Sequence, residues 1–292
     1  MPGYTFFPVD PRLAEVVEAI WETDIPDAKA ARSIVMPVVT PILCFHYRWA
    51  PALCFDLRAR LDDQAWIAAG RFRITGVQSR AAGLLANGPV GGVMVRLKPE
   101  TAARLARGAV TESYDAAFLV GDVFGPSDAS LLEDMLAAAS TAAQRVAAVQ
   151  SFLLRRLRDD AIDPLVRGAI FALRREPSLR VRGLAAQLGV SERHLSRRFR
   201  AATGATAKQF ARIVRIGRVV AAARRQREGW AEIAISCGFS DQAHMVNDFS
   251  AMIGSAPEEF FQRTALLTPA AAASSAAESD FFNTFLVDRA TA

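Results

Sequence analysis

The spacing of apolar residues in the first 160 positions alternates between that of strands and that of helices. Short branched or aromatic runs bounded by Pro and Gly predict strands at 33–39, 42–49, 53–57, 71–75 and 93–97. Leu13, Val16, Val17 and Ile20 recur at helical spacing, which predicts a helix over 11–21, and the same period recurs at 127–138 and 141–158. The Gly91-Gly92 pair reads as a turn. The pattern predicts a β-rich body closed by a helical hairpin.

From Asp163 onward the chain changes to helical periods separated by very short, Gly-containing turns. We therefore predict an α+β chain with three parts. Residues 1–160 form a mixed, β-rich domain for ligand sensing or dimerisation, and residues 161–264 form an all-α DNA-binding domain. Residues 265–292 form an Ala/Ser-rich tail that we expect to be mobile. The apolar stretch 281–287 within it is a candidate for docking, although the pattern names no partner.

The stretch 184–199 has the pattern of two helices that meet at a sharp turn. Leu184 and Ala185 give the first helix an apolar face, and Gly189 supplies a turn residue with positive φ. Ser191 is placed to cap the second helix, on which Leu195 and Phe199 point into a core. The opposite face of that helix is polar and Arg-rich, which suits the major groove of DNA.

The same arrangement recurs about fifty residues later, over 232–249. Ile233 and Ala234 take the places of Leu184 and Ala185, Gly238 stands at the turn, and Met245 and Phe249 repeat the core pair. Between the two units, residues 207–227 predict a long helix. About twenty helical residues span roughly 30 Å, close to the ~34 Å between neighbouring major-groove segments on one face of DNA. The spacing predicts two helix-turn-helix units joined by a rigid helix.

The formal net charge of +5 is unevenly distributed. Residues 1–162 carry a balance of −1, whereas residues 163–263 carry +8. An Arg-rich solvated face would give the same numbers, but a basic half attached to a near-neutral half favours a polyanionic partner for one domain only. Double-stranded DNA is the partner we expect.

Residues 180–263 resemble the DNA-binding domain of the AraC/XylS family of transcription regulators. The resemblance rests on motifs in both units and at their ends: Leu184-Ala185, Gly189, Leu195 to Phe199, Gly204, Ile233-Ala234, Gly238 to Asp241, His244, Phe249, Gly254 and Pro257. It implies DNA contacts from two sets of residues. The first set is Arg193, Ser196, Arg197 and Arg200, and the second is Gln242, Ala243, Val246 and Asn247.

The second unit departs from the family pattern. Where the family usually has a basic residue followed by Phe-Lys or Phe-Arg, this chain has Asn247, Asp248, Phe249 and Ser250. Two interpretations stay open. The helix either contacts DNA through Gln242 and Asn247, which can read adenine edges, or acts as a structural brace with weak affinity of its own.

Residues 1–158 are similar, more weakly, to an N-terminal domain of unknown function that precedes many AraC-type regulators. The similarity implies a small-molecule effector or a homodimer, and RNA polymerase is a further candidate partner. We take an activator as the working hypothesis, while the sequence leaves open whether transcription is raised or lowered. The aromatic residues of this region have two interpretations, an ordinary core or an apolar ligand pocket. They are Trp21, Phe45, Tyr47, Trp49, Phe55, Trp66 and Phe72.

Other chemistry has little support in the sequence. Cys44, Cys54 and Cys237 show no CxxC spacing, and the three histidines lack a second metal ligand nearby. We expect no cofactor, no metal, no membrane segment and no enzymatic activity, in a chain that stays in the cytoplasm. Two alternatives remain: an N-terminal enzyme that uses an activated thiolate, such as a methyl-transfer protein, or an interaction adaptor with weakened DNA binding.

Overall fold

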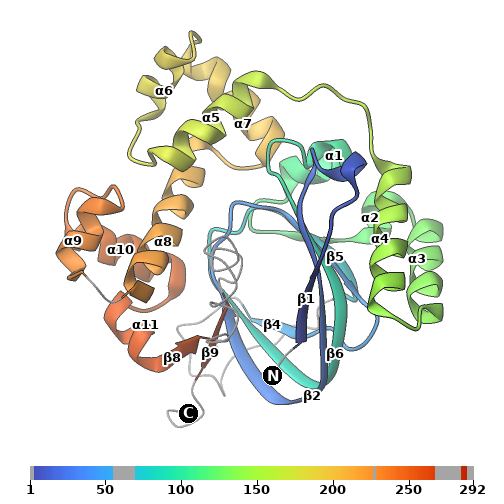
Figure 1. The fold of residues 1–292 in the computed structure, drawn as a ribbon. Coiled ribbons are helices and arrows are strands. Elements are labelled where there is room, and N and C mark those ends of the chain that lie inside the picture. Colours follow the sequence, from blue (N-terminus) through green and yellow to red (C-terminus); the bar gives the residue numbers. More distant parts are fainter. Residues whose placement is uncertain (1–2, 55–69, 226–227, 267–283, 288–292) are drawn as a thin grey trace.

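The computed structural model describes residues 3–54, 70–225, 228–266 and 284–287 (Figure 1). Its N-terminal region is built on one antiparallel sheet, whose central path runs β7-β5-β3-β6-β2. β1 pairs with β2, and β4 pairs with β6. The strands are β1 (Gly3–Phe7), β2 (Val17–Val35), β3 (Ile42–His46), β4 (Ala52–Cys54), β5 (Phe72–Thr75), β6 (Ala82–Leu97) and β7 (Ala117–Leu119).

One face of this sheet forms the core of the N-terminal region. Leu43 and Phe45 of β3 pair in register with Val95 and Val93 of β6, and all four are buried. Phe152 of α4 meets Phe45 edge to face, with ring centroids 6.1 Å apart. The hairpin of α3 (Pro126–Ala138) and α4 (Ala142–Arg156) closes the body and confirms the helices predicted at 127–138 and 141–158. The short helices α1 (Ala103–Glu112) and α2 (Val120–Phe124) precede it.

The helix predicted over 11–21 is wrong. The chain makes a single 3-10 turn, η1 (Pro11–Leu13), capped by the Asp10 side chain, and enters β2 at Val17. Leu13, Val16 and Ile20 are nevertheless buried, as the pattern required. Three buried positions spaced by three and four residues fit a helix, but a turn followed by an extended strand places the same residues in the core, and β-branched Val16 and Val17 favour the strand.

The turn predicted at Gly91-Gly92 is also wrong, because both residues lie inside β6, opposite Asp24 and Thr23 of β2. A Cβ atom at Gly91 would lie 2.6 Å from the Tyr47 ring, and one at Gly92 would lie 3.0 Å from His46. Glycine is therefore used here to let His46 at the end of β3, and Tyr47 directly after it, pack against the strand. Glycines inside a strand mark such close approach as well as turns.

The C-terminal region is helical, which confirms the predicted fold class of a β-rich part followed by an all-α part. α6 and α7 form the first helix pair, α9 and α10 form the second, and α8 lies between the pairs (Figure 1). The helices are α5 (Pro164–Arg175), α6 (Val181–Gln187), α7 (Glu192–Thr203), α8 (Ala207–Arg225), α9 (Trp230–Ser236), α10 (Gln242–Ile253) and α11 (Pro257–Arg263).

The two regions share a core at the end of α10. Met36, Val77 and Ala81 of the N-terminal region are buried in one cluster with Met252 and Ile253. The Ala81 amide donates to the Met252 carbonyl across this contact at 2.8 Å. The second helix pair is thus attached to the sheet region through the end of α10 that carries none of the predicted DNA contacts.

Two short strands follow α11. β8 (Thr264–Leu266) pairs with β9 (Thr284–Val287), and β9 pairs with Ser33–Val35 of β2. Part of the apolar stretch 281–287 therefore lies on the edge of the N-terminal sheet. Residues 267–283, where the tail was expected to be mobile, lie outside the described residues.

Candidate nucleic-acid interface

Each helix pair contains a turn that requires glycine. Gly189 follows α6 with φ of 68°, and Gly238 follows α9 with φ of 87°. This left-handed backbone is costly for residues with a Cβ atom, so the turn geometry explains both glycines. The positive φ predicted for Gly189 is confirmed, and its counterpart in the second unit shares it.

The two recognition helices, α7 and α10, begin and end in the same way. The Ser191 hydroxyl accepts from the His194 amide at 3.2 Å, and an Asp241 carboxylate oxygen accepts from the His244 amide at 2.7 Å. These side chains satisfy amides that the first helical turn leaves free. Both helices end at a left-handed glycine, Gly204 or Gly254.

The two recognition helices also share one packing scheme. Leu195 and Phe199 of α7 are fully buried, as are Met245 and Phe249 of α10. Phe199 meets Phe210 of α8 edge to face at 5.4 Å, and Phe249 meets Phe260 of α11 edge to face at 5.7 Å. Each of these residues lies fifty positions from its counterpart. The second unit is therefore a structural repeat of the first.

On α7 the residues predicted to contact DNA lie on the surface. Arg193, Arg197 and Arg200 are exposed, and Ser196 is half-buried. The only described hydrogen-bond contact of these three guanidinium groups is that of Arg197 Nη2 with His194 Nδ1, at 3.4 Å. Helix α1 of the N-terminal region lies next to α7, but these three arginines are still exposed, so the described part of that region leaves the basic face open to solvent.

On α10 the predicted residues are also at the surface, but they are uncharged. Gln242, Ala243 and Asn247 are exposed, whereas Val246 is half-buried and packs against the core of the second unit. The α10 surface can therefore offer amide hydrogen bonds and apolar contacts to DNA but no cation.

Residues next to these positions connect the helices to one another, and the sequence reading missed them. Asp248 of α10 pairs with Arg212 at 2.9 Å and with Arg215 at 3.5 Å, both from α8. The Arg215 guanidinium also lies 4.7 Å above the Phe239 ring. Burial lowers the pKa of Arg215, and the Asp248 carboxylate acts in the opposite direction.

Arg218 continues the i, i+3 series of arginines on α8 and contacts a different helix. Its Nη2 atom donates to the carbonyl oxygens of Arg174 and Arg175 at 2.7 Å each, at the end of α5. A cation there complements the partial negative charge at a helix C-terminus. The regular spacing of Arg212, Arg215 and Arg218 could have indicated a bracing face in the sequence.

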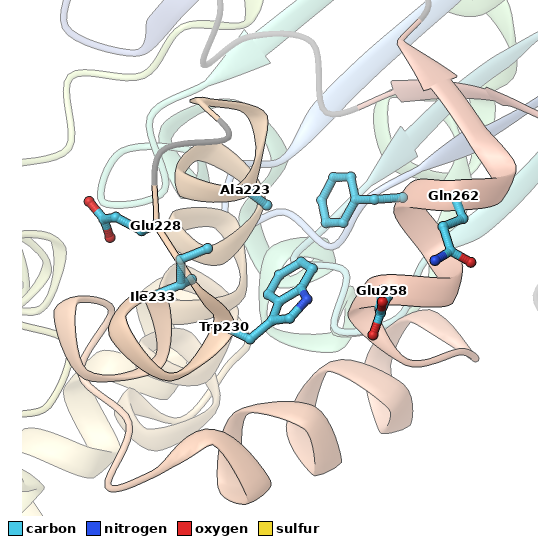
Figure 2. A pocket seen from close by; sticks show the side chains of 7 residues that line it. Ala223, Glu228, Trp230, Ile233, Glu258 and Gln262 are labelled. Atoms are coloured by element: carbon cyan, nitrogen blue, oxygen red, sulfur yellow. The ribbon is translucent and has the colours of Figure 1, made fainter.

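A shallow hollow lies between the end of α8, α9 and α11 (Figure 2). It has a volume of about 410 Å³ and is lined in part by Trp230 and Phe261, whose stacked rings are 6.0 Å apart. Glu228 and Glu258 are also in its lining. Carboxylates repel phosphate, so this hollow is unsuited to contact with DNA.

Features that could support other chemistry are weak within the described part of the chain. Across those residues, no cluster of three or more His, Cys, Asp or Glu side chains is arranged to hold a metal ion. Cys44 and Cys237 are buried thiols, and burial raises the pKa of Cys237. Cys237 lies in the helical region, and its raised pKa disfavours the thiolate form there. The side chain of Cys54 is outside the described set.

Helices that could cross a membrane are also lacking among the described residues, since none there is long and apolar enough.

Comparison with known proteins identifies the helical region. Residues 184–263 match the family model described as a helix-turn-helix domain. No curated protein matches the chain. The match confirms the resemblance drawn from the sequence. Residues 184–263 form a helix-turn-helix DNA-binding domain of the AraC type, a domain that transcription regulators carry. The match covers less than a third of the chain and says nothing of the N-terminal region.

Solved structures give weaker similarities. ToxT from Vibrio cholerae aligns at 10% identity and a TM-score of 0.45, over 83% of this chain and 98% of that one. The C-terminal domain of AraT, a response regulator from Geobacillus stearothermophilus, aligns at 21% identity and a TM-score of 0.34, over 35% and 88%. A DNA-binding transcriptional dual regulator from Escherichia coli K-12 aligns at 18% identity and a TM-score of 0.32, over 36% and 96%. TM-scores this low carry no conclusion about function.

Proposed function

We propose that this protein recognises a specific duplex DNA sequence with α7 and α10 and regulates transcription from that site. The observation that carries the proposal is the open basic face of α7 on the first of two repeated helix-turn-helix units. In this proposal the DNA-binding domain spans residues 161–264, and the sheet region 1–160 controls it.

The two helices contribute different chemistry to recognition. Arg193, Arg197 and Arg200 contact phosphates or the edges of guanine, and Ser196 adds a short hydrogen bond. On α10, Gln242 and Asn247 read adenine edges, while Ala243 and Val246 contact thymine methyl groups. Most of the salt-dependent affinity then comes from α7, because only cations release counterions from DNA.

Selection of sites from random duplex DNA by the full chain tests this proposal. We expect a sequence motif with two parts, and an affinity that falls steeply as salt rises. Arg193→Gln should flatten the salt dependence by about one phosphate contact, ~0.9 in log–log slope. Arg12→Gln is the matched control, because Arg12 is an exposed arginine of η1 that is distant from α7 in the sequence. This variant should leave the slope unchanged. Failure to enrich any motif, or a slope that both variants leave unchanged, would contradict the proposal.

A second candidate function, control by a small molecule, is favoured by one buried arginine. Arg73 of β5 is 9% exposed, and its buried Nε and Nη1 atoms have no hydrogen-bond partner among the residues that the structure describes. Its neighbours in the sheet are also basic or neutral. His46 is neutral because burial lowers its pKa to about 3, and the positive charges of Arg73 and Arg71 act in the same direction. A buried cation without a counter-charge is costly, so this face of the sheet favours an anion. We propose that the effector carries a carboxylate or phosphate held by Arg73.

Thermal unfolding of the full chain tests this assignment, with a series of carboxylates from acetate to octanoate as probes and the matching alcohols as controls. Binding to the native state alone raises the melting temperature. We expect at least one carboxylate to raise it while the matching alcohol does not, and Arg73→Met to abolish the shift. Arg80→Met, at an exposed position, should preserve it. An equal shift in both variants, or none with any carboxylate, would count against an anion site at Arg73.

We further propose that the regulator acts as a homodimer and contacts RNA polymerase as an activator. Leu131 of α3 is 49% exposed, which offers an apolar contact on the outer side of the α3–α4 hairpin. Sedimentation of the full chain and of Leu131→Asp tests dimerisation, and transcription in vitro from a template that carries the selected site tests activation. A monomer at all concentrations, or unchanged transcription, would remove the corresponding part of the proposal.

A further inference from the structure

Both recognition helices are attached by an ion pair to the helix that precedes their unit. In the first unit, Arg198 Nε of α7 lies 2.8 Å from Asp163 Oδ2, and the other oxygen of Asp163 accepts from the Leu165 amide at the start of α5. In the second unit, Asp248 of α10 pairs with Arg212 and Arg215 of α8. Each ion pair therefore connects a recognition helix to its own supporting helix.

These ion pairs occupy the same place in the repeat, with opposite charge. Arg198 and Asp248 are fifty residues apart and each directly precedes the buried Phe, Phe199 or Phe249. Fifty residues after Asp163 lies Ile213, which is one residue from Arg212 and two from Arg215. The acid is on the supporting helix in the first unit and on the recognition helix in the second.

Burial of at least one partner distinguishes these contacts from ordinary surface pairs. The side chains of Asp163, Asp248 and Arg215 are only 16–17% exposed, although their partners Arg198 and Arg212 are 48% and 38% exposed. In an ordinary surface pair such as Arg263–Glu259, both partners are about half exposed. Pairs at the surface contribute little, but removal of one partner from a partly buried pair leaves a charge without compensation. The groups that face Asp248 are Arg212, Arg215 and, at 3.8 Å, His244 Nε2.

We infer that Asp163–Arg198 and Asp248–Arg212/Arg215 are positioning clamps, which set the orientation of α7 and α10 on their supporting helices and thereby the spacing between the two halves of the DNA site. Arg198, Asp248, Arg212 and Arg215 are positioning residues in this scheme, because they act through the recognition helices and not on the bases. In this scheme Asp248 stands on α10 because it pairs with the α8 arginines, and it has no contact with DNA of its own. The inference rests on the proposed recognition of a two-part DNA site.

The experiment uses the full chain and the motif that the wild-type protein selects, together with duplexes in which one base pair is added or removed between the two halves. Hydroxyl-radical footprints report each half separately. Asp248→Asn should weaken protection of the half read by α10 and leave the other half protected, and Arg198→Met should do the reverse. We expect the preference for the native spacing to fall by about tenfold in each variant, within the range for residues that share one network.

A matched control and a milder variant separate this role from a loss of folding. Glu258→Gln removes the same charge from α11, which has no part in either clamp, and should keep the footprint and the spacing preference of the wild type. If Asp248→Asn does not fold, Arg212→Met, at a 38% exposed partner, should weaken the same half of the site to a smaller extent. If Asp248→Asn folds, Arg212→Met can be added to it. In that double variant, Arg212→Met should change the spacing preference less than it does in the otherwise wild-type chain.

The outcomes distinguish this inference from the function it rests on. Selection of no motif by the wild-type protein would remove the proposed DNA recognition itself. A wild-type protein that selects a two-part motif, with variants that weaken both halves equally or keep the spacing preference, would overturn the clamps and leave DNA recognition standing.

Discussion

The first and second helix-turn-helix units have the same architecture and different surfaces. Both have a left-handed glycine at the turn, a side-chain cap on the recognition helix and a buried Phe that meets another Phe edge to face. The exposed face of α7 carries arginines, whereas that of α10 carries Gln242 and Asn247. The comparison shows that the interior of the repeat is constrained by packing and backbone geometry, while its exposed positions are free to differ.

The largest expected effect concerns the shared interior. Phe199→Ala and Phe249→Ala each remove a fully buried ring, and each should lower the free energy of unfolding by about 3–5 kcal/mol. Denaturant unfolding of the full chain, followed by circular dichroism, measures both values. A difference above ~2 kcal/mol between the two would show that the units are unequal in packing as well as in surface, since such losses scale with the cavity left behind.

A smaller effect is expected at the turn glycines. Gly189→Ala should cost about 1–2 kcal/mol, because alanine strains the left-handed backbone, although no atom of the described residues lies within 4 Å of the added Cβ. Gly238→Ala should cost at least as much, since its Cβ would also lie 3.3 Å from the Cβ of Ser178. The same unfolding experiment ranks them, and a Gly189 variant more destabilised than the Gly238 variant would reverse the expected order.

The smallest effect distinguishes the two caps by pH. The pKa of Asp241 is lowered by its hydrogen bonds with the His244 amide and Ser240, whereas the Ser191 hydroxyl does not titrate in this range. A carboxyl whose pKa is lower in the folded state stabilises the fold above its unfolded pKa and loses this contribution as pH falls through the folded value. Amide exchange in the first turn of α10 should therefore accelerate relative to α7 as pH falls below about 4, after correction for intrinsic rates. Asp241→Ser should remove the difference, and an equal response in wild type would contradict it.

The sequence predicted the helical region better than the sheet region, for physical reasons. Turn glycines, caps and the spacing of Leu195 and Phe199 are local signals, so the helix pairs and their outer faces could be predicted directly from the sequence. The strands β2 and β6 depend on long-range pairing. Gly91 within β6 has the sequence signature of a turn, and only the packing of Tyr47 against it explains the glycine. The apolar spacing of 11–21 was compatible with two structures, and the sheet core selected the strand.

The candidate site shows the same division between local and long-range signals. The exposed faces of α7 and α10 could be predicted from helical periodicity alone. The partners of Asp248 could not, because they lie on α8 and depend on how the helices cross. From the sequence alone, Asp248 could be described only as part of a segment that lacks the basic residues of the family pattern.

The claim that α7 is the charged reader and α10 the uncharged one is tested most directly by a salt titration of the full chain on its selected duplex and on a scrambled one. Arg197→Ala should cost about 1–3 kcal/mol on the selected site and reduce the salt slope by about 0.9. Asn247→Ala should cost less and leave the slope unchanged, because the amide carries no charge. Asn247→Arg with Ser250→Lys should instead tighten binding to both duplexes and steepen the slope by about one to two units. Equal losses from Arg197→Ala and Asn247→Ala, with equal changes in slope, would show that both helices read DNA alike and would contradict the account.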